Sequence, residues 1–132
     1  MIETGITQEA RLLWLKSILN DTCRLALYTQ EAELGPMTRT YTEEGEVKGQ
    51  GYTAGGLKLK GCCVEPDEAS GGAFITWESP VWPKASITAA GYMIYDTSKN
   101  NTTLFVGAWG SNYTSTNGPF TVNLPPNHIG LV

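Results

Sequence analysis

The chain has 132 residues, which is enough for one ordinary domain with its own hydrophobic core. Its net charge of -4 comes without a cluster of Lys and Arg residues, and this argues against a nucleic-acid-binding protein. No apolar run approaches the roughly 18–20 residues that cross a bilayer, and the N-terminal segment lacks the features of a secretory signal, so we expect no membrane partner and synthesis in the cytoplasm. Charged residues make up only 17% of the chain, against roughly 25% in typical soluble domains, which favours a protein packed in an assembly.

An amphipathic helix is predicted over Gln8–Leu19. Thr7 suits the N-cap, and Glu9 lies in the first turn, where the helix dipole favours an anion. The apolar stripe consists of Leu12, Leu15, Ile18 and Leu19, widened by Ala10, Leu13, Trp14 and Ser17. This arc is broader than a single contact face needs. Either the helix packs on a sheet of its own domain, or Trp14 and part of the leucine face dock on another subunit.

The rest of the chain has the composition of short strands and turns. The predicted strands are Arg24–Thr29, Met37–Tyr41, Leu57–Val64, Ala73–Trp77, Lys84–Tyr95, Thr102–Trp109 and Pro119–Leu124. Gly35–Pro36 marks a turn, and the five glycines of Glu43–Gly56 predict a long, partly ordered surface loop. Pro80–Pro83 interrupts the chain, Gly110–Gly118 is a polar turn region, and Pro125–Val132 is an extended tail.

The strongest strand signal is a central hairpin over Lys84–Trp109. Its two arms are rich in β-branched and aromatic residues, and the polar segment Asp96–Asn101 separates them. Neither face of the first arm is strongly polar, so we expect other elements to cover both faces. One helix followed by strands at intervals of roughly ten residues favours a mainly β fold, an antiparallel β-sandwich or jelly roll with one N-terminal α-helix. We expect an N-terminal helical arm over 1–23 and a β-sandwich domain over 24–132.

Residues suited to catalysis, cofactor binding or metal binding do not form a convincing set. The carboxylates of Glu43, Glu44 and Glu46 share one glycine-rich loop, whereas glycoside hydrolysis needs two carboxylates on opposite walls of a cleft, so we expect a solvated charged loop. His128 lies in the Pro-rich tail and lacks the neighbours of a zinc site or a nucleophile–base pair. The three cysteines, Cys23, Cys62 and Cys63, are expected to be reduced thiols. The prediction is a non-enzymatic protein without a cofactor.

Aromatic residues are the remaining candidates for recognition. Trp77, Trp82, Trp109, Tyr92, Tyr95 and Tyr113 are compatible with a sugar-stacking platform, although packing in the core or at an interface is the favoured interpretation. Trp82, between two prolines, is expected to be the most exposed. The candidate protein-interface residues are Leu12, Trp14, Leu15, Ile18, Leu19, Tyr52 and Trp82.

Four segments resemble small structural proteins of tailed bacteriophages. They are Leu25–Thr29, Glu46–Gly56, Ile87–Tyr95 and Phe120–Pro125. Their order is similar to that in capsid cement or decoration proteins and covers about residues 24 to 125, whereas the helix over Gln8–Leu19 departs from shorter proteins of this kind.

The resemblance implies a β-sandwich or jelly-roll body, no enzymatic activity and a place on the capsid surface of the virion. It also implies binding across subunits of the major capsid protein, often as a symmetric homo-oligomer such as a dimer or trimer. The alternative is a tail or neck protein, or a virion module that binds host glycans.

Overall fold

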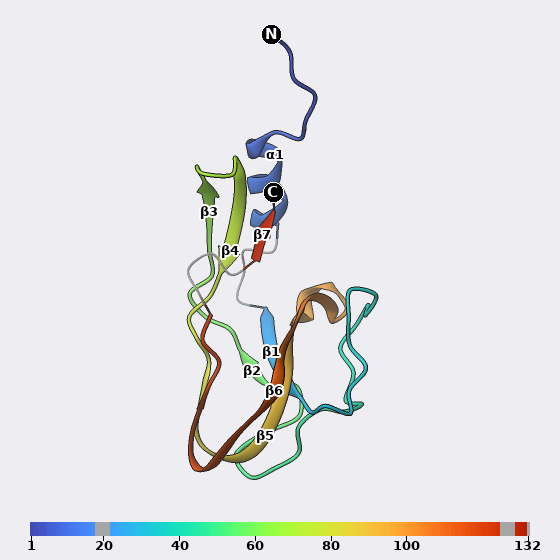
Figure 1. Cartoon of the computed structure of the whole chain (residues 1–132), viewed down its shortest axis with the longest axis vertical. Coiled ribbons are helices and arrows are strands. Elements are labelled where there is room, and N and C mark those ends of the chain that lie inside the picture. Colours follow the sequence, from blue (N-terminus) through green and yellow to red (C-terminus); the bar gives the residue numbers. More distant parts are fainter. Residues whose placement is uncertain (18–21, 125–128, 132) are drawn as a thin grey trace. The chain divides into compact units, whose positions relative to one another are not determined.

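The computed structural model describes residues 1–17, 22–124 and 129–131. It is mainly β with one N-terminal helix, as the sequence predicts. The elements are α1 (Gln8–Lys16), β1 (Cys23–Tyr28), β2 (Leu57–Lys58), β3 (Cys63–Asp67), β4 (Gly72–Thr76), β5 (Val81–Asp96), the 3-10 turn η1 (Thr97–Lys99), β6 (Thr102–Thr121) and β7 (Ile129–Leu131) (Figure 1). The strands form two antiparallel sheets, with the orders β2-β1-β5-β6 and β3-β4-β7.

The chain divides into two compact units. One unit combines α1 with β3, β4 and β7, and the other contains β1, β2, β5, β6 and the loops that join them. The boundary expected between residues 23 and 24 stays a prediction.

In the first unit, α1 begins where the sequence predicts. The Thr7 hydroxyl accepts a hydrogen bond from the amide of Ala10 at 3.2 Å and so caps the helix. The helix contacts β3 and β4, and Gln8 Nε2 donates to the carbonyl of Gly72 at 3.0 Å. The described helix ends at Lys16, and residues 18 and 19 of the predicted helix lie outside the described residues.

The predicted central hairpin is confirmed as β5 and β6. Tyr92, Met93, Ile94 and Tyr95 are all buried, so both faces of the second half of β5 are covered, as expected. On one face, Met93 and Tyr95 form a core cluster with Ala26 and Tyr28 of β1, and Ala32, Leu34 and Tyr41 pack against it.

Near its start, β5 is covered on one face only. Trp82, Ala85, Ile87 and Ala89 are buried, whereas Lys84, Ser86 and Thr88 between them are exposed. The expectation that both faces are covered is therefore wrong for this half of the strand.

Both arms of the hairpin are longer than predicted. Pro83 does not interrupt the chain, because a register shift between Trp82 and Ala85 places it outside the regular ladder. Residues 110–118 are not a turn, since β6 continues through them and pairs with β5 as far as Val81↔Thr121. A polar composition here reflects an exposed strand face rather than a break.

The predicted strand Leu57–Val64 is split into β2 and β3, which belong to different sheets. Gly61 lies between them with φ of +66°, a left-handed conformation that ends regular extension.

The glycine-rich segment 43–56 is more ordered than the sequence suggests. The amide of Val47 donates to the carbonyl of Leu27 at 3.0 Å, and the carbonyl of Gln50 accepts from the amide of Ser86 at 2.9 Å. A β-carbon at Gly56 would lie 1.8 Å from the carbonyl oxygen of Leu25, so this glycine permits close contact between backbones. The segment is a loop, as predicted, and isolated bridges and backbone hydrogen bonds attach it to β1 and β5, which the sequence does not predict.

Candidate functional site

The structure divides the predicted apolar face of α1 into a packed side and an exposed side. Leu15 is buried at 5% exposure and Leu12 is half-buried, so these two residues belong to the interior of their own unit. Leu13 and Trp14, at 68% and 52% exposure, are directed to solvent. We call Leu13 and Trp14 the exposed helix pair. Ile18 and Leu19 lie outside the described residues.

The two other predicted interface residues lie in the second unit and contact each other. Tyr52 is half-buried, and its ring stacks on Trp82 with the ring centroids 5.7 Å apart. Trp82 is only 3% exposed, so the prediction that it is the most exposed tryptophan is wrong. Phe120 packs edge-on against Trp82. The prolines next to Trp82 in the sequence do not reveal this contact.

A buried carboxylate is the centre of a hydrogen-bond network in the second unit. Glu46 is 5% exposed, and it accepts hydrogen bonds from the phenols of Tyr41 and Tyr52. The amide of Gly55 adds a third donor at 2.8 Å. The expectation of a solvated charged loop is therefore wrong for Glu46, although Glu43 and Glu44 are exposed as expected.

Further hydrogen bonds extend this network to the strands. The Tyr52 oxygen accepts from the amide of Leu27 at 2.9 Å, and Tyr95 donates to the carbonyl of Gly55 at 2.6 Å. Arg24 also donates to this loop, from its guanidinium to the carbonyl of Gly56 at 2.6 Å. Both carboxylate oxygens of Glu46 are engaged by donors of the chain itself, so the arrangement pins segment 43–56 against β1 and β5.

The electrostatics of the network keep its phenols protonated. Burial, followed by the hydrogen bond to Glu46, raises the pKa of Tyr41 and of Tyr52 far above the usual value near 10. Burial also raises the pKa of Tyr28, whose hydroxyl donates to the carbonyl of Thr42 at 2.6 Å. The three phenols are therefore hydrogen-bond donors that stabilise the fold.

Asp96 is a second buried carboxylate, at the turn between β5 and β6. Burial raises its pKa, but hydrogen bonds from Thr22 and Ser98 outweigh that effect and leave the pKa below its usual range. The Asp96 side chain caps η1 and so fixes the turn of the hairpin.

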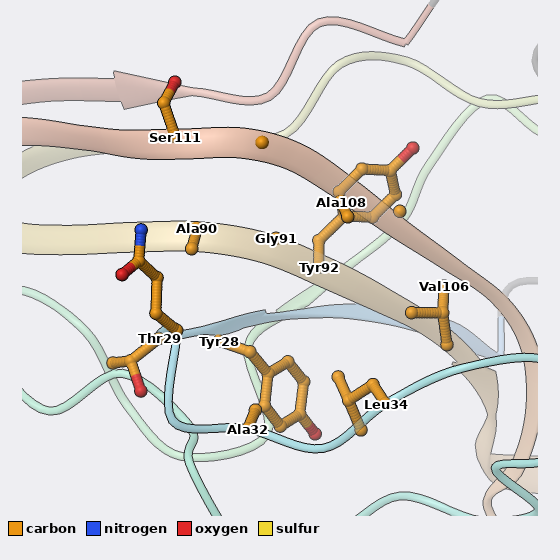
Figure 2. A pocket seen from close by; sticks show the side chains of 13 residues that line it. Tyr28, Thr29, Ala32, Leu34, Ala90, Gly91, Tyr92, Val106, Ala108 and Ser111 are labelled. Carbon is orange, nitrogen blue, oxygen red and sulfur yellow. The ribbon is translucent and has the colours of Figure 1, made fainter.

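An open groove lies over one face of the hairpin formed by β5 and β6. A cavity of about 440 Å³ lies between the loop that carries Ala32 and Leu34 and the strand residues Ala90, Val106 and Ala108 (Figure 2). A second cavity, of about 560 Å³, lies between residues 34–38 and residues 103–108 and shares Leu34, Val106 and Ala108 with the first. We call the two together the β6 groove.

The β6 groove has an uncharged lining. None of the described residues that line its two cavities is acidic or basic, and many have small side chains, such as Gly91, Gly107 and Gly110. This groove is not among the sites predicted from the sequence. The small residues of both hairpin arms are a signal for it, because small side chains on paired strands leave the backbone accessible.

In residues 1–17, 22–124 and 129–131, no three His, Cys, Asp or Glu side chains gather in a way that could hold a metal ion. No helix in the same ranges has the length and apolar character needed to cross a membrane. His128 lies outside them.

Comparisons with protein-family models, curated proteins and solved structures found no match to this chain.

Proposed function

We propose that this chain is a non-enzymatic structural protein of a tailed-bacteriophage virion, a capsid cement or decoration protein that bridges subunits of the major capsid protein. The observation that carries the proposal is the exposed helix pair. Leu13 and Trp14 present apolar surface on a helix whose other side is already packed in its own unit. Exposed apolar side chains of this kind are typical of protein–protein contacts, in which tryptophan often contributes most of the binding energy.

The composition supports the same role. Few charged residues and many Thr, Ser, Asn and Gly residues suit a surface that spends its time in contact with other proteins. The buried carboxylate Glu46 supports a structural rather than a catalytic role, because its two oxygens accept hydrogen bonds from three donors of the chain. The finer arrangement of the strands as a β-sandwich or jelly roll stays part of this proposal.

A capsid-binding assay tests the proposal. Purified protein is mixed with mature capsids or expanded procapsids that lack it, and the bound copies per particle are counted after sedimentation. We expect saturation at a fixed stoichiometry. Absence of saturable binding to either particle would end the cement hypothesis.

Variants of the exposed helix pair identify the contact. We expect Leu13→Ser and Trp14→Ser to weaken capsid binding by about tenfold or more each, because each removes an exposed apolar side chain from the contact. Thr116→Ser, on the exposed part of β6, is the matched control and should bind as the unmodified protein does. Equal binding by all variants would contradict a role for α1 in the contact.

The alternative is a virion module that binds host glycans. Tyr113 favours it, because this ring is 54% exposed and lies edge-on to Trp109 with the centroids 5.6 Å apart. A glycan array with Tyr113→Ala as its control distinguishes the two functions. Trp82→Ala is unsuitable as that control, since Trp82 is buried and its loss would destabilise the fold.

A further inference from the structure

One face of the four-stranded sheet is left open across three neighbouring strands. Gly91 of β5 is paired with Tyr28 of β1 on one side and with Ala108 of β6 on the other, and all three residues line the cavity of about 440 Å³ in the β6 groove. Residues that are paired in this way share one face of a sheet. Because glycine and alanine carry almost no side chain, the space above these two strands stays unfilled.

The adjacent part of the same face is filled. Met93, two residues beyond Gly91, is fully buried in the core cluster with Tyr28, and Leu34 packs against that cluster. Leu34 also lines the cavity. The groove therefore begins beside the covered part of the face, and an apolar side chain from outside would continue the packing there.

The loop on one side of the groove separates uncharged side chains from carboxylates. Ala32 and Leu34 are half-buried and line the cavity of about 440 Å³ (Figure 2). Glu31 and Glu33, which alternate with them in the sequence, are exposed and line a different cavity, of about 320 Å³. The backbone of this loop thus lies between an uncharged groove and a row of carboxylates.

Two further carboxylates extend this row. Glu43 and Glu44 are exposed, and each lines a cavity together with Glu31. Lys48 is the one basic residue among the described residues that line these two cavities, and Arg39, the other basic residue of segment 29–48, lines neither of them. The surface beside the groove is therefore negatively charged, which attracts basic partners and repels acidic ones.

We propose that the β6 groove binds a basic segment of a partner protein that presents a large apolar side chain. The apolar side chain enters the cavity beside Ala108, and the Lys or Arg residues next to it in the segment lie near Glu31 and Glu33. A charged side chain does not enter the cavity itself, because the uncharged lining offers it no ion pair. Gln30 and Ser111, which line the cavity and are exposed, provide hydrogen bonds to the backbone of the segment. The inference does not depend on the capsid role.

Short synthetic peptides test which chemistry the groove takes. The probes are fluorescent peptides Lys-Lys-X-X-Lys-Lys in which X is Leu, Phe or Trp, and the comparison peptides replace X by Ser or every Lys by Glu. Fluorescence anisotropy at low salt measures binding. We expect at least one basic apolar peptide to bind saturably with a dissociation constant below about 1 mM, and both kinds of comparison peptide to bind at least about tenfold more weakly. Equal binding of the Ser peptide would show attraction by charge alone and would overturn the proposal, as would the absence of saturable binding by every basic apolar peptide.

Two variants of the protein locate the site. Ala108→Phe fills the cavity without changing the charge, and Ala108 is exposed, so the substitution does not disturb the core. Thr116→Phe, an exposed position on β6 outside the lining of the groove, is the matched control. We expect Ala108→Phe to weaken peptide binding by at least about tenfold and Thr116→Phe to leave it unchanged. Circular dichroism establishes that each variant is folded, and unchanged binding by folded Ala108→Phe protein would place the site elsewhere.

Charge variants test the row of carboxylates. The double variant Glu31→Gln/Glu33→Gln keeps the shape of both side chains, and we expect it to bind the basic peptides about three- to tenfold more weakly and with a smaller loss of affinity when salt is added. Glu3→Gln/Glu68→Gln removes the same charge from exposed positions of the first unit and is the matched control. Equal effects of the two double variants would contradict recognition by this row.

Sedimentation velocity distinguishes a partner protein from a second copy of this chain. We expect the unmodified protein and both phenylalanine variants to have the same state of association. Self-association that Ala108→Phe abolishes and Thr116→Phe retains would show that a second copy occupies the groove, and this result would overturn the proposal.

Discussion

Glu46 accepts a hydrogen bond from the phenol of Tyr52 inside the protein, although Glu46 comes from a Glu-Glu-Gly-Glu sequence that has the appearance of a solvated loop. Tyr52 in turn stacks on Trp82 and accepts a hydrogen bond from the amide of Leu27. One carboxylate–phenol contact therefore connects the glycine-rich segment to β1 and to the aromatic residues Trp82 of β5 and Phe120 of β6.

Replacing the buried carboxylate should destabilise the fold. Glu46→Gln keeps the shape of the side chain but removes the charge that strengthens its three hydrogen bonds, and we expect the free energy of unfolding to fall by about 2–3 kcal/mol. Urea denaturation measures this. Glu44→Gln, two residues earlier and exposed, should change the stability by less than about 0.5 kcal/mol. Similar losses in both variants would show that the contacts of Glu46 are not responsible.

The two phenols of the network should not be equivalent. Tyr52→Phe leaves the amide of Leu27 without its acceptor and removes one of the two donors to Glu46 Oε2, which keeps the amide of Gly55, and we expect a loss of about 2–3 kcal/mol. Tyr41→Phe removes only a donor to the other oxygen of Glu46, and Tyr41 is half-buried, so water can replace it and the loss should be about 1 kcal/mol. Urea denaturation of the two variants gives the order, and a larger loss for Tyr41→Phe would contradict this assignment.

Stability should decrease in alkaline solution. Burial raises the pKa of Tyr92 to about 12, and the pKa values of Tyr41 and Tyr52 are raised further. An unfolded tyrosine loses its proton near pH 10, so above that pH the folded chain binds more protons than the unfolded chain, and the free energy of unfolding falls as pH rises. The contribution is complete below about pH 10 and is lost progressively through about pH 12 and above.

Absorbance of ionised tyrosine and circular dichroism, recorded together during an alkaline titration, measure this loss. The buried tyrosines should ionise only as the fold is lost. Tyr41→Phe should reduce the alkaline decrease in stability relative to the unmodified protein. Ionisation of all tyrosines near pH 10 with the fold intact would contradict the prediction.

Two glycines with similar backbone angles should respond differently to the same substitution. Gly56 and Gly71 have φ of +77° and +74°, so alanine is strained at either position by about 1–2 kcal/mol. At Gly56 the added carbon would also lie 1.8 Å from the carbonyl oxygen of Leu25, whereas nothing lies within 4 Å at Gly71. We expect Gly56→Ala to cost more than about 3 kcal/mol and Gly71→Ala about 1–2 kcal/mol, measured by urea denaturation. Equal costs would contradict the close approach of segment 43–56 to β1.

Local patterns in the sequence are sufficient to predict the helix and the central hairpin of this fold. Thr7 and the apolar spacing of Gln8–Lys16 predict the capped helix, because capping and periodicity depend on residues within one or two turns. The β-branched and aromatic runs on either side of Asp96–Asn101 predict the hairpin for the same reason.

Other features of the fold depend on residues that are distant in the sequence. Residues 110–118 have the composition of a turn, and they form a strand because Ala85, Ile87 and Ala89 of β5 lie opposite them. Glu46 is buried because Tyr41 and Tyr52 offer donors, and Trp82 is buried because Tyr52 and Phe120 cover it. The cost of burying a charge or the gain from burying a ring depends on neighbours that local sequence does not specify.

The two sides of α1 also differ because of contacts with residues that are distant in the sequence. Its apolar pattern predicts a broad contact surface but does not say which part is used within the chain. The position of β3 and β4 decides that Leu15 is buried and that Leu13 and Trp14 remain exposed. The β6 groove is likewise a product of packing, since its walls come from residues 28–38 and 90–111, which only the folded sheet brings together.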